Sequence, residues 1–223
     1  MLLYDFHTHT FLSDGCLSPL EMLRRAAVAG YSAVAITDHV GPGSLARVLD
    51  EIQQDCALAR AHWNILAIPG VELTHVPPAA IGDLARRAKQ LGASLVIVHG
   101  ETLVEPVIQG TNLAAVQCPD VDILAHPGTL TKEEAELASR TGVFIEITTR
   151  KGHCQSNAEV ARVAREASAL TLVNSDAHGP EDLLNPELVT ATAYAAYCDD
   201  SLIRSTLEVN PTLLIERIRT TLK

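Results

Sequence analysis

Basic residues are in the minority in this sequence. Its 17 lysines and arginines face 27 aspartates and glutamates, which gives a formal net charge of −10. A surface that binds long nucleic acids needs a stripe of lysine and arginine, so we do not expect that class of partner. A small anionic substrate is still compatible with this composition, because bound metal ions reverse the field locally.

Cysteine is sparse and shows no framework spacing. The five cysteines are odd in number, scattered along the chain, and never form a C-x-x-C pair. Disulfide frameworks and structural zinc sites both need paired or closely spaced cysteines. We therefore expect neither in this protein.

Long apolar runs are also missing. No stretch reaches the roughly 20 apolar residues that span a membrane, and the first residues, MLLYDFHTHT, lack the basic start and apolar run of a signal peptide. We expect a cytoplasmic protein without membrane association. Hydrophobic residues make up 47% of the 223 positions, and no linker or repeat interrupts them, so we expect one domain over residues 1–223.

Short apolar runs alternate with helical patterns along the chain. The runs are rich in valine, isoleucine, leucine and alanine, as is typical of strands buried in a parallel sheet. They predict strands at Leu2–Phe6, Ala33–Thr37, Leu66–Val71, Leu95–His99, Asp122–Ala125, Val143–Ile147 and Leu170–Asn174.

The segments between these strands have the periodicity and the end signals of helices. The first has Ser18 as its expected N-cap, Pro19 at the first helical position and Gly30 just past the end. Helices are predicted at Pro19–Ala29, Leu45–Ala61, Ile81–Leu91, Thr131–Ser139 and Asn157–Ser168.

This alternation predicts an α/β fold with a parallel sheet and right-handed crossovers. Seven strand repeats favour a closed or nearly closed barrel over an open sheet. Residues 112–118 are expected to form one irregular helical turn. The tail after Pro186 is expected to be helical, with a break near Asn210-Pro211.

Metal-binding residue types gather where the predicted strands end. Six of the seven strands deliver a histidine, an aspartate or a glutamate there, and the sixth strand has Glu146 just inside its end. In parallel α/β barrels this end of the strands carries the active site. A single histidine would be read as a surface or core residue, but a set this regular indicates one shared site. The candidates are His7, His9, Asp14, His39, Glu72, His99, His126, Asp176 and His178.

These residue types suit a catalytic metal site. Histidine nitrogens and carboxylate oxygens together bind zinc, manganese or iron, and a set without thiolates is more typical of catalytic than of structural sites. His7-x-His9 places two side chains on one face of an extended segment, and Asp176-x-His178 is expected to do the same. Glu72 is the natural candidate to bridge two ions.

Taken together, these motifs resemble those of the PHP (polymerase and histidinol phosphatase) family. They appear as His7-Thr8-His9, Asp14, Thr37-Asp38-His39, Glu72, His99, His126-Pro127 and Asp176-Ala177-His178, from the first predicted strand to the seventh. The resemblance implies a distorted (β/α)7 barrel that hydrolyses phosphoric esters with about two to three divalent transition-metal ions. It assigns one ion to His7, His9, Glu72 and Asp176, a second to Glu72, His99 and His126, and a third to Asp14, His39 and His178.

A phosphate substrate fits the charge of such a site. Three divalent ions bring about +6, three carboxylates about −3 and a bridging hydroxide about −1, which leaves roughly the charge that a phosphate dianion balances. The implied mechanism is in-line attack on phosphorus by the metal-bridging hydroxide. We therefore expect hydrolysis of a small phosphomonoester, as in histidinol-phosphate phosphatases.

Several further residues are candidates for this face of the barrel. Arg150 follows the sixth strand, and its planar guanidinium suits a phosphate clamp, although a solvated loop residue is the alternative for both Arg150 and Lys151. His153 is a candidate to contact the substrate or to donate a proton. Glu101 and Glu146 are candidates to orient a ligand, and Glu101 is also a candidate to meet a substrate cation.

Two other functions stay open at this point. One is a phosphodiesterase or exonuclease of the PHP type that acts on nucleotides or short oligonucleotides. The other is a metal-binding module without activity, which would be expected to lack ligands, whereas none is missing here. His62 and His75 fit no motif, and we expect them to be structural.

Overall fold

The strands form one parallel sheet that curls into a barrel. The computed structural model describes residues 2–197, 199–220 and 222. Within them, neighbouring strands pair in the order β1-β2-β4-β5-β6-β7-β8, and β3 pairs with β4. The strands are β1 (Leu3–Asp5), β2 (Tyr31–Ile36), β3 (His39–Val40), β4 (Leu66–Leu73), β5 (Leu95–His99), β6 (Ile123–Ala125), β7 (Phe144–Thr148) and β8 (Thr171–Asn174).

The barrel closes, or nearly closes, between its first and last strands. Thr8 and Ala177, just beyond β1 and β8, form a parallel bridge, and the His9 amide donates to the Ala177 carbonyl at 2.8 Å. Earlier along both segments, the Asn174 side chain accepts a hydrogen bond from the Phe6 amide at 3.0 Å. The contacts that close the barrel therefore lie beside the residues expected to bind metal.

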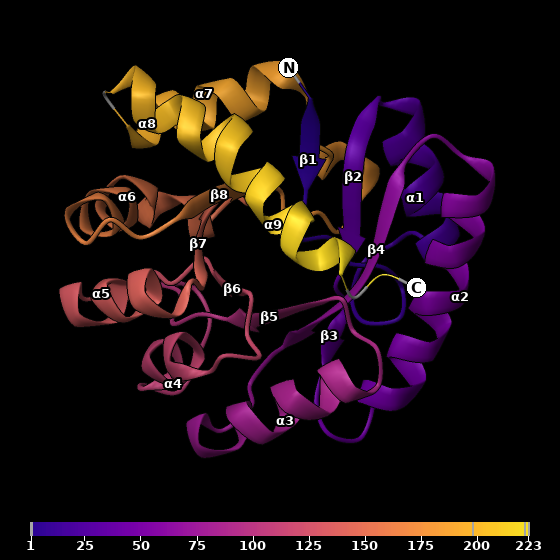
Figure 1. The fold of residues 1–223 in the computed structure, drawn as a ribbon, viewed down its shortest axis with the longest axis horizontal. Helices are drawn as coiled ribbons and strands as arrows, with labels where there is room; N and C mark the ends of the chain where they lie inside the picture. The colour runs from indigo at the N-terminus through magenta and orange to yellow at the C-terminus, as the bar shows by residue number, and fades with distance from the viewer. Residues whose placement is uncertain (1, 198, 221, 223) are drawn as a thin grey trace.

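The helices lie outside the sheet, except for the last one, which crosses an end of the barrel (Figure 1). They are α1 (Pro19–Val28), α2 (Leu45–His62), α3 (Pro78–Gln90), α4 (Thr111–Gln117), α5 (Lys132–Thr141), α6 (Asn157–Glu166), α7 (Pro186–Ala196), α8 (Asp200–Arg204) and α9 (Asn210–Arg219). Local signals fix their ends. Ser18 caps α1 by accepting from the Glu21 amide, and Thr131 with Glu134 forms a capping box at the start of α5. In the described part of the chain, no helix is long and apolar enough to cross a membrane.

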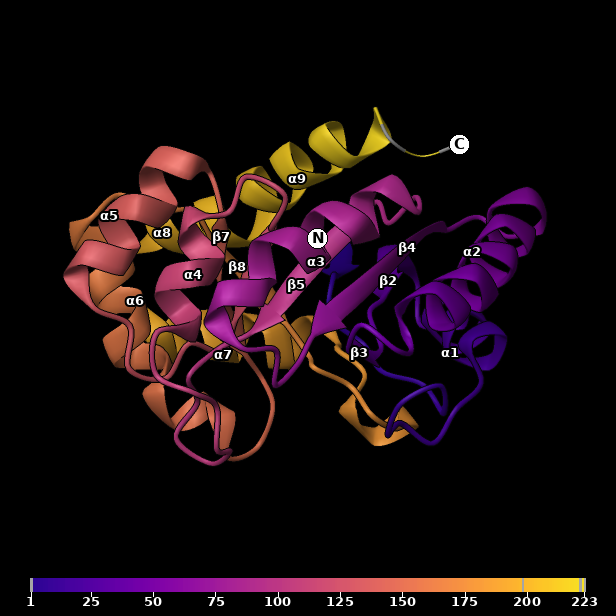
Figure 2. The same ribbon diagram turned by 90° about the horizontal axis from the view of Figure 1, so that it is seen from below.

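Apolar side chains form two separate layers. One fills the space between the sheet and the surrounding helices. The other fills the barrel and is completed by Leu214, Ile215 and Ile218 of α9. Figure 2 shows α9 on the side of the barrel opposite the loops that follow the strands. The barrel residues of this inner layer are Phe6, Ala33, Ala35, Ile68, Leu95, Ile97, Ile123, Ala125, Phe144 and Leu172.

Several predicted boundaries differ from the structure. The third predicted strand continues as β4 to Leu73, so Glu72 lies inside the strand and not after it. The two-residue strand β3 is too short to show any periodicity. Helix α4, over residues 111–117, is longer than the single irregular turn expected there, and α3 begins three residues earlier than predicted, at Pro78.

The predicted break at Asn210-Pro211 is wrong. The chain stays helical from α8 through a π-helical turn, η3 (Ser205–Val209), into α9. Proline clashes with the preceding turn of a regular helix, but here it occupies the first turn of α9, directly after the widened π turn. The Asn210 side chain also donates to the Thr171 carbonyl of β8, which ties this helix to the barrel.

Candidate metal centre

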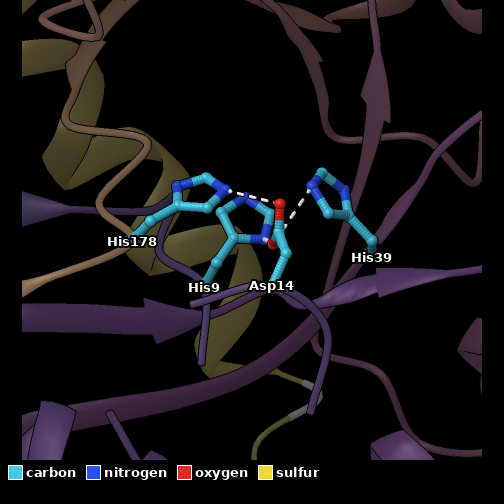
Figure 3. A group of neighbouring side chains, drawn as sticks. All are labelled: His9, Asp14, His39 and His178. Atoms are coloured by element: carbon cyan, nitrogen blue, oxygen red, sulfur yellow. Dashed lines mark hydrogen bonds and ion pairs between the residues drawn. The ribbon is translucent and has the colours of Figure 1, made fainter. Parts of the chain in front are cut away.

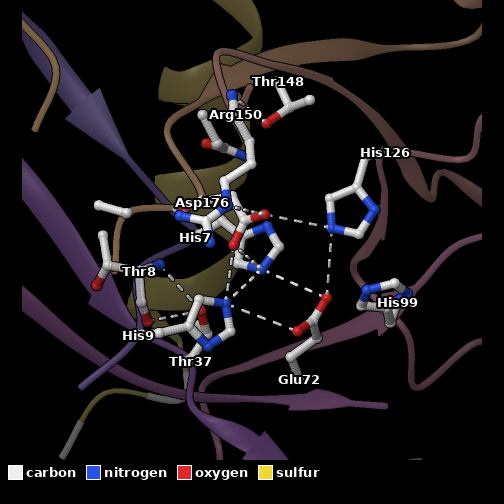
Figure 4. Close-up of polar contacts among 12 residues, drawn as sticks. His7, Thr8, His9, Thr37, Glu72, His99, His126, Thr148, Arg150 and Asp176 are labelled. Carbon is white, nitrogen blue, oxygen red and sulfur yellow. Dashed lines mark hydrogen bonds and ion pairs between the residues drawn. The ribbon is translucent and has the colours of Figure 1, made fainter. Parts of the chain in front are cut away.

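The nine candidate ligands all lie at the carboxyl ends of the strands, and they contact one another in a continuous cluster. Figure 4 shows the inner part of this cluster. Each residue follows or ends the strand that was expected to carry it, apart from Glu72. The cluster is formed by His7, His9, Asp14, His39, Glu72, His99, His126, Asp176 and His178.

Glu72 lies at the centre of this cluster and is fully buried. Its Oε1 is 3.4 Å from His7 Nε2 and 3.8 Å from His126 Nε2. Its Oε2 is 2.6 Å from His39 Nδ1 and 3.7 Å from His9 Nε2. Each oxygen thus faces a different pair of imidazoles, which is the arrangement needed for a carboxylate that bridges two ions.

Asp176 faces the same space from the segment that follows β8. Its Oδ1 is 3.1 Å from His9 Nε2, and its Oδ2 is 3.7 Å from His126 Nε2. The backbone at Asp176 is left-handed, with φ of 55°, so the extended segment expected for Asp176-x-His178 is wrong. The turn still brings His178 Nδ1 within 3.6 Å of Asp176 Oδ1.

A second, more exposed group lies around Asp14 (Figure 3). Its Oδ2 is 3.1 Å from His178 Nε2, and its Oδ1 is 3.5 Å from His39 Nε2. His9 Nδ1 lies 4.0 Å from the same Oδ1. The loop that carries Asp14 is fixed by the Asp38 carboxylate, which accepts hydrogen bonds from the backbone amides and side-chain hydroxyls of Thr10 and Ser13.

His99 lies beside His126, with 4.5 Å between ring centroids. Gly100 makes this approach of β5 and β6 possible, because a side chain there would collide with the Ala125 carbonyl. The His99 Nε2 atom points toward Glu105 Oε2, 3.0 Å away, and not toward Glu72.

The closest groups of potential ligand atoms in the described chain differ from the expected ones. His99 falls outside them, and His9 joins the group of the proposed third ion. The groups are His9 with Asp14, His39 and His178; His7 with Glu72 and His126; and His7 and His9 with Asp176.

The buried charges of the cluster perturb one another. Burial opposes the charged form of His7, but Glu146 and Glu72 outweigh it and hold the His7 pKa well above its usual value. The Glu72 pKa lies well below its usual value, since His7 and His39 overcome the cost of burial. Burial raises the pKa of Asp176 to about 7, although His7 opposes the shift. Burial, together with the charge of His99, lowers the pKa of His126.

Two buried carboxylate oxygens show that the cluster fits cations. Glu72 Oε1 and Asp176 Oδ1 are buried and have no hydrogen-bond partner. Such oxygens are costly unless a partner satisfies them. Their neighbours are imidazole nitrogens, and nitrogen and carboxylate donors together suit divalent transition metals. The residues present therefore fit divalent metal ions.

Arg150 and His153 lie at the same face, as predicted. The Arg150 Nη1 atom is 3.4 Å from Asp182 Oδ2 and donates to the Asp176 carbonyl at 3.3 Å. The His153 ring is 4.4 Å from that of His126 between centroids, and its Nδ1 is 2.7 Å from Thr102 Oγ1.

A cavity of about 330 Å³ opens over the cluster, and both Arg150 and His153 line it. His75, expected to be structural, lines it too, whereas Lys151 does not. The candidate ligands in its wall are Asp14, His39, His99, Asp176 and His178.

Other residues hold the site without facing the cavity. Glu146 Oε2 is 2.8 Å from His7 Nδ1 and accepts from the Asn174 side chain, so it orients the His7 ring, the role weighed for it from the sequence. Glu101 does not orient a candidate ligand. One of its carboxylate oxygens instead accepts hydrogen bonds from the backbone amides of Gly110 and Asn112.

Sequence reasoning missed Glu105 and Asp182. Asp182 accepts from the backbone amides of His178 and Gly179 and also pairs with Arg150, so it positions two site residues. The position of Asp182, four residues after His178, is the sequence feature that could have indicated its role. Glu105 is in an irregular loop and offered no comparable signal.

Comparisons with known proteins place this arrangement in a family. A protein of uncharacterised function from Methanocaldococcus jannaschii is 44% identical over 96% of this chain and 99% of its own. A probable phosphatase of Shewanella loihica is 29% identical over 79% of this chain and 78% of its own. Other relatives carry nuclease names.

The fold is also shared with solved structures. A chain from the crystal structures of YwqE from Bacillus subtilis and CpsB from Streptococcus pneumoniae, described as metal-dependent tyrosine phosphatases, matches with a TM-score of 0.59. It is 17% identical, and the match covers 99% of this chain and 94% of the other. The family model of the PHP domain matches residues 5–184, which include the whole metal cluster. The chain therefore belongs to the PHP domain family of metal-dependent phosphoester hydrolases.

Proposed function

We propose that this protein hydrolyses small phosphomonoesters with divalent metal ions held by the nine-residue cluster. The observation that carries the proposal is the cavity above the cluster. Its volume of about 330 Å³ is at the lower end of the range for small-molecule sites, roughly 300–1,000 Å³. A phosphate with a small leaving group fits this space better than a strand of nucleotides.

Bound ions would supply an activated water as the nucleophile and would neutralise the charge of the phosphate. In our proposal, His7, His9, Glu72 and Asp176 would hold an inner ion, and Glu72 with His126 and His99 would hold a second. The exposed group of Asp14, His39 and His178 would hold a third. In this structure His99 contacts Glu105 instead.

Arg150 binds the phosphate oxygens from the β8 side of the cavity. Asp182 restricts the guanidinium through its contact with Nη1, and the Asp176 carbonyl accepts from the same atom. A guanidinium held in this way presents its remaining N–H groups to a tetrahedral anion in a fixed orientation.

His153 is the proposed proton donor to the leaving oxygen. It lines the cavity beside His126, and Thr102 fixes its ring through Nδ1. A positioned imidazole of this kind typically contributes about 100- to 10,000-fold to a proton-transfer step.

A substrate screen tests the proposal. The purified protein, loaded separately with Zn²⁺, Mn²⁺ or Fe²⁺, would be assayed on a panel of phosphorylated metabolites beside dinucleotides and short oligonucleotides. We expect metal-dependent release of inorganic phosphate from small monoesters. Cleavage of dinucleotides or oligonucleotides with no turnover of any monoester would instead support the phosphodiesterase alternative, to which the nuclease relatives point.

A further inference from the structure

The His9 imidazole lies between two groups of potential metal ligands and belongs to both. One is the inner group with Asp176, and the other is the exposed group around Asp14. The His9 ring is fully buried, and its centroid is 4.2 Å from that of His39 and 4.3 Å from that of His178 (Figure 3). The ring therefore separates the inner part of the cluster from the exposed part.

The two nitrogens of the His9 ring face different groups. Nε2 is 3.1 Å from Asp176 Oδ1, 3.0 Å from His7 Nε2 and 3.7 Å from Glu72 Oε2. Nδ1, the other nitrogen of the ring, is 4.0 Å from Asp14 Oδ1. Donors that share one transition-metal ion at about 2.0–2.2 Å lie roughly 3–4 Å apart. Each nitrogen is therefore placed to bind a different ion.

The Nδ1 atom of His9 is buried and has no hydrogen-bond partner. In most histidines of the cluster a hydrogen bond at Nδ1 fixes the ring and leaves Nε2 as the ligand atom. Four residues have such a bond: His7 with Glu146, His39 with Thr74, His99 with the Gly100 carbonyl and His178 with the Asp176 carbonyl.

His126 Nδ1 is also buried without a partner, but His126 belongs to one ligand group and not to two. A buried polar atom without a partner costs stability. A cation in the exposed group would satisfy the Nδ1 atom of His9, because that atom already lies toward Asp14.

We propose that His9 binds two ions at once, the inner ion through Nε2 and the third ion through Nδ1. The ring then carries no N–H proton, and the proton passes to solvent when the second of its two nitrogens binds an ion. The third ion gains a fourth protein ligand, and one rigid ring links it to the inner ion. The inference rests on the proposed function only in the assignment of ions to the inner and exposed groups.

Two substitutions of His9 separate the roles of its nitrogens. A glutamine places its amide group near the position of Nε2 and has no donor at the position of Nδ1, whereas an asparagine does the reverse. His9→Gln and His9→Asn would be compared with His7→Gln and His62→Gln. His7 lies only in inner groups, and its Nδ1 is held by Glu146. His62 is an exposed histidine at the end of α2, outside the cluster.

The affinity of each site for Zn²⁺ would be measured by competition with a chelator of known affinity. Anomalous diffraction from Zn²⁺-loaded crystals would show which positions are occupied. In the wild-type protein we expect the third ion at about 2.0–2.1 Å from His9 Nδ1. This distance is decisive even if a variant does not fold.

The two His9 variants should change the relative affinity of the sites in opposite directions. His9→Gln should weaken the third ion by at least about tenfold, the scale on which metal sites respond to a lost contact, and should weaken the inner ion less. His9→Asn should weaken the inner ion more than the third. His7→Gln should weaken inner ions only, and His62→Gln should weaken none.

Equal affinity for the third ion in the wild-type protein and in His9→Gln would overturn the inference. A water molecule between Nδ1 and the third ion, or a wild-type protein that binds no third ion, would overturn it as well. Failure of the proposed function gives a different result, in which ions bind but no phosphomonoester is hydrolysed. The Zn²⁺ affinities and the crystal structure then still decide the role of His9.

Discussion

The two ends of the barrel have opposite chemistry. At the amino ends of the strands, α9 lies across the opening, and Leu214 and Ile218 join the inner apolar layer, where they are 0% and 1% exposed. At the carboxyl ends the buried side chains are imidazoles and carboxylates, and some of their atoms have no hydrogen-bond partner. Apolar burial stabilises the first end, whereas buried polar groups cost stability at the second. The stability gained at the apolar end therefore offsets the cost of the buried charges at the polar end.

Removing metal from the polar end should have the largest effect on activity. A strong chelator, followed by its removal, should abolish phosphoester hydrolysis, because the protein groups alone provide no activated water. Hydrolysis should return when divalent ions are added back. Elemental analysis of the active protein should find at least about two transition-metal ions per chain. Full activity in metal-free protein would remove the basis for the polar end as a catalytic site.

Asp176→Asn should have the next largest effect. The variant keeps the size of the side chain but loses its charge, and kcat should fall by at least about 100-fold, or about 2.7 kcal/mol.

The same variant should not lose stability when metal is absent. Because burial raises the pKa of Asp176 to about 7 in the metal-free protein, the ionised carboxylate opposes folding at any pH above its unfolded pKa. The melting temperature of the metal-free variant at pH 8 should therefore match or exceed that of wild type. Near-normal turnover with full metal loading would refute the role assigned to this residue.

Arg150→Ala should have a smaller effect. It removes a group that binds phosphate but leaves the metal cluster in place, so kcat/KM for phosphomonoesters should fall by about 10- to 100-fold, or about 1.4–2.7 kcal/mol. Arg150→Lys should recover only part of the loss, since an ammonium group does not copy the planar fork. Inhibition by inorganic phosphate should weaken in parallel. If both measurements are unchanged, Arg150 is a loop residue without a catalytic role.

Leu214→Ala, at the apolar end, should have the smallest effect on activity and the largest on stability. Removing a fully buried leucine leaves a cavity and typically costs about 2–5 kcal/mol. Urea titration should show this loss, while kcat/KM of the folded protein at low temperature should stay within about twofold of wild type. A large loss of activity without a loss of stability would mean that the two ends are coupled.

The polar end was largely predictable from the sequence, because a parallel barrel brings all strand ends to one place. The histidines and carboxylates at those ends were therefore sufficient to predict which residues meet. The sequence did not predict as well which residues contact one another inside the cluster. The turn of His99 toward Glu105 depends on a loop whose path is set by Glu101 and Asn112, and no local pattern encodes such contacts.

The apolar end was harder to predict. Apolar periodicity indicates helices after Pro186 but does not indicate that the last one crosses the barrel. Pro211 suggested a break because proline disrupts a regular helix, and the π turn that precedes it has no recognisable sequence signal. The interior of the barrel shows the same limitation, since residues such as Phe144 and Leu172 pack against one another only after the sheet closes.

Barrel closure also affects the order of folding. The Ser175 hydroxyl donates to the Asp5 carboxylate across a separation of 170 residues, and the bridge between Thr8 and Ala177 lies directly above it. Contacts this distant in sequence form slowly, because a long loop must be ordered before they contribute. His7, His9 and Asp176 come together only through this closure, so a chain still emerging from the ribosome lacks the inner ion site. Ions that bind the closed barrel more tightly than the open chain shift the equilibrium toward closure by mass action.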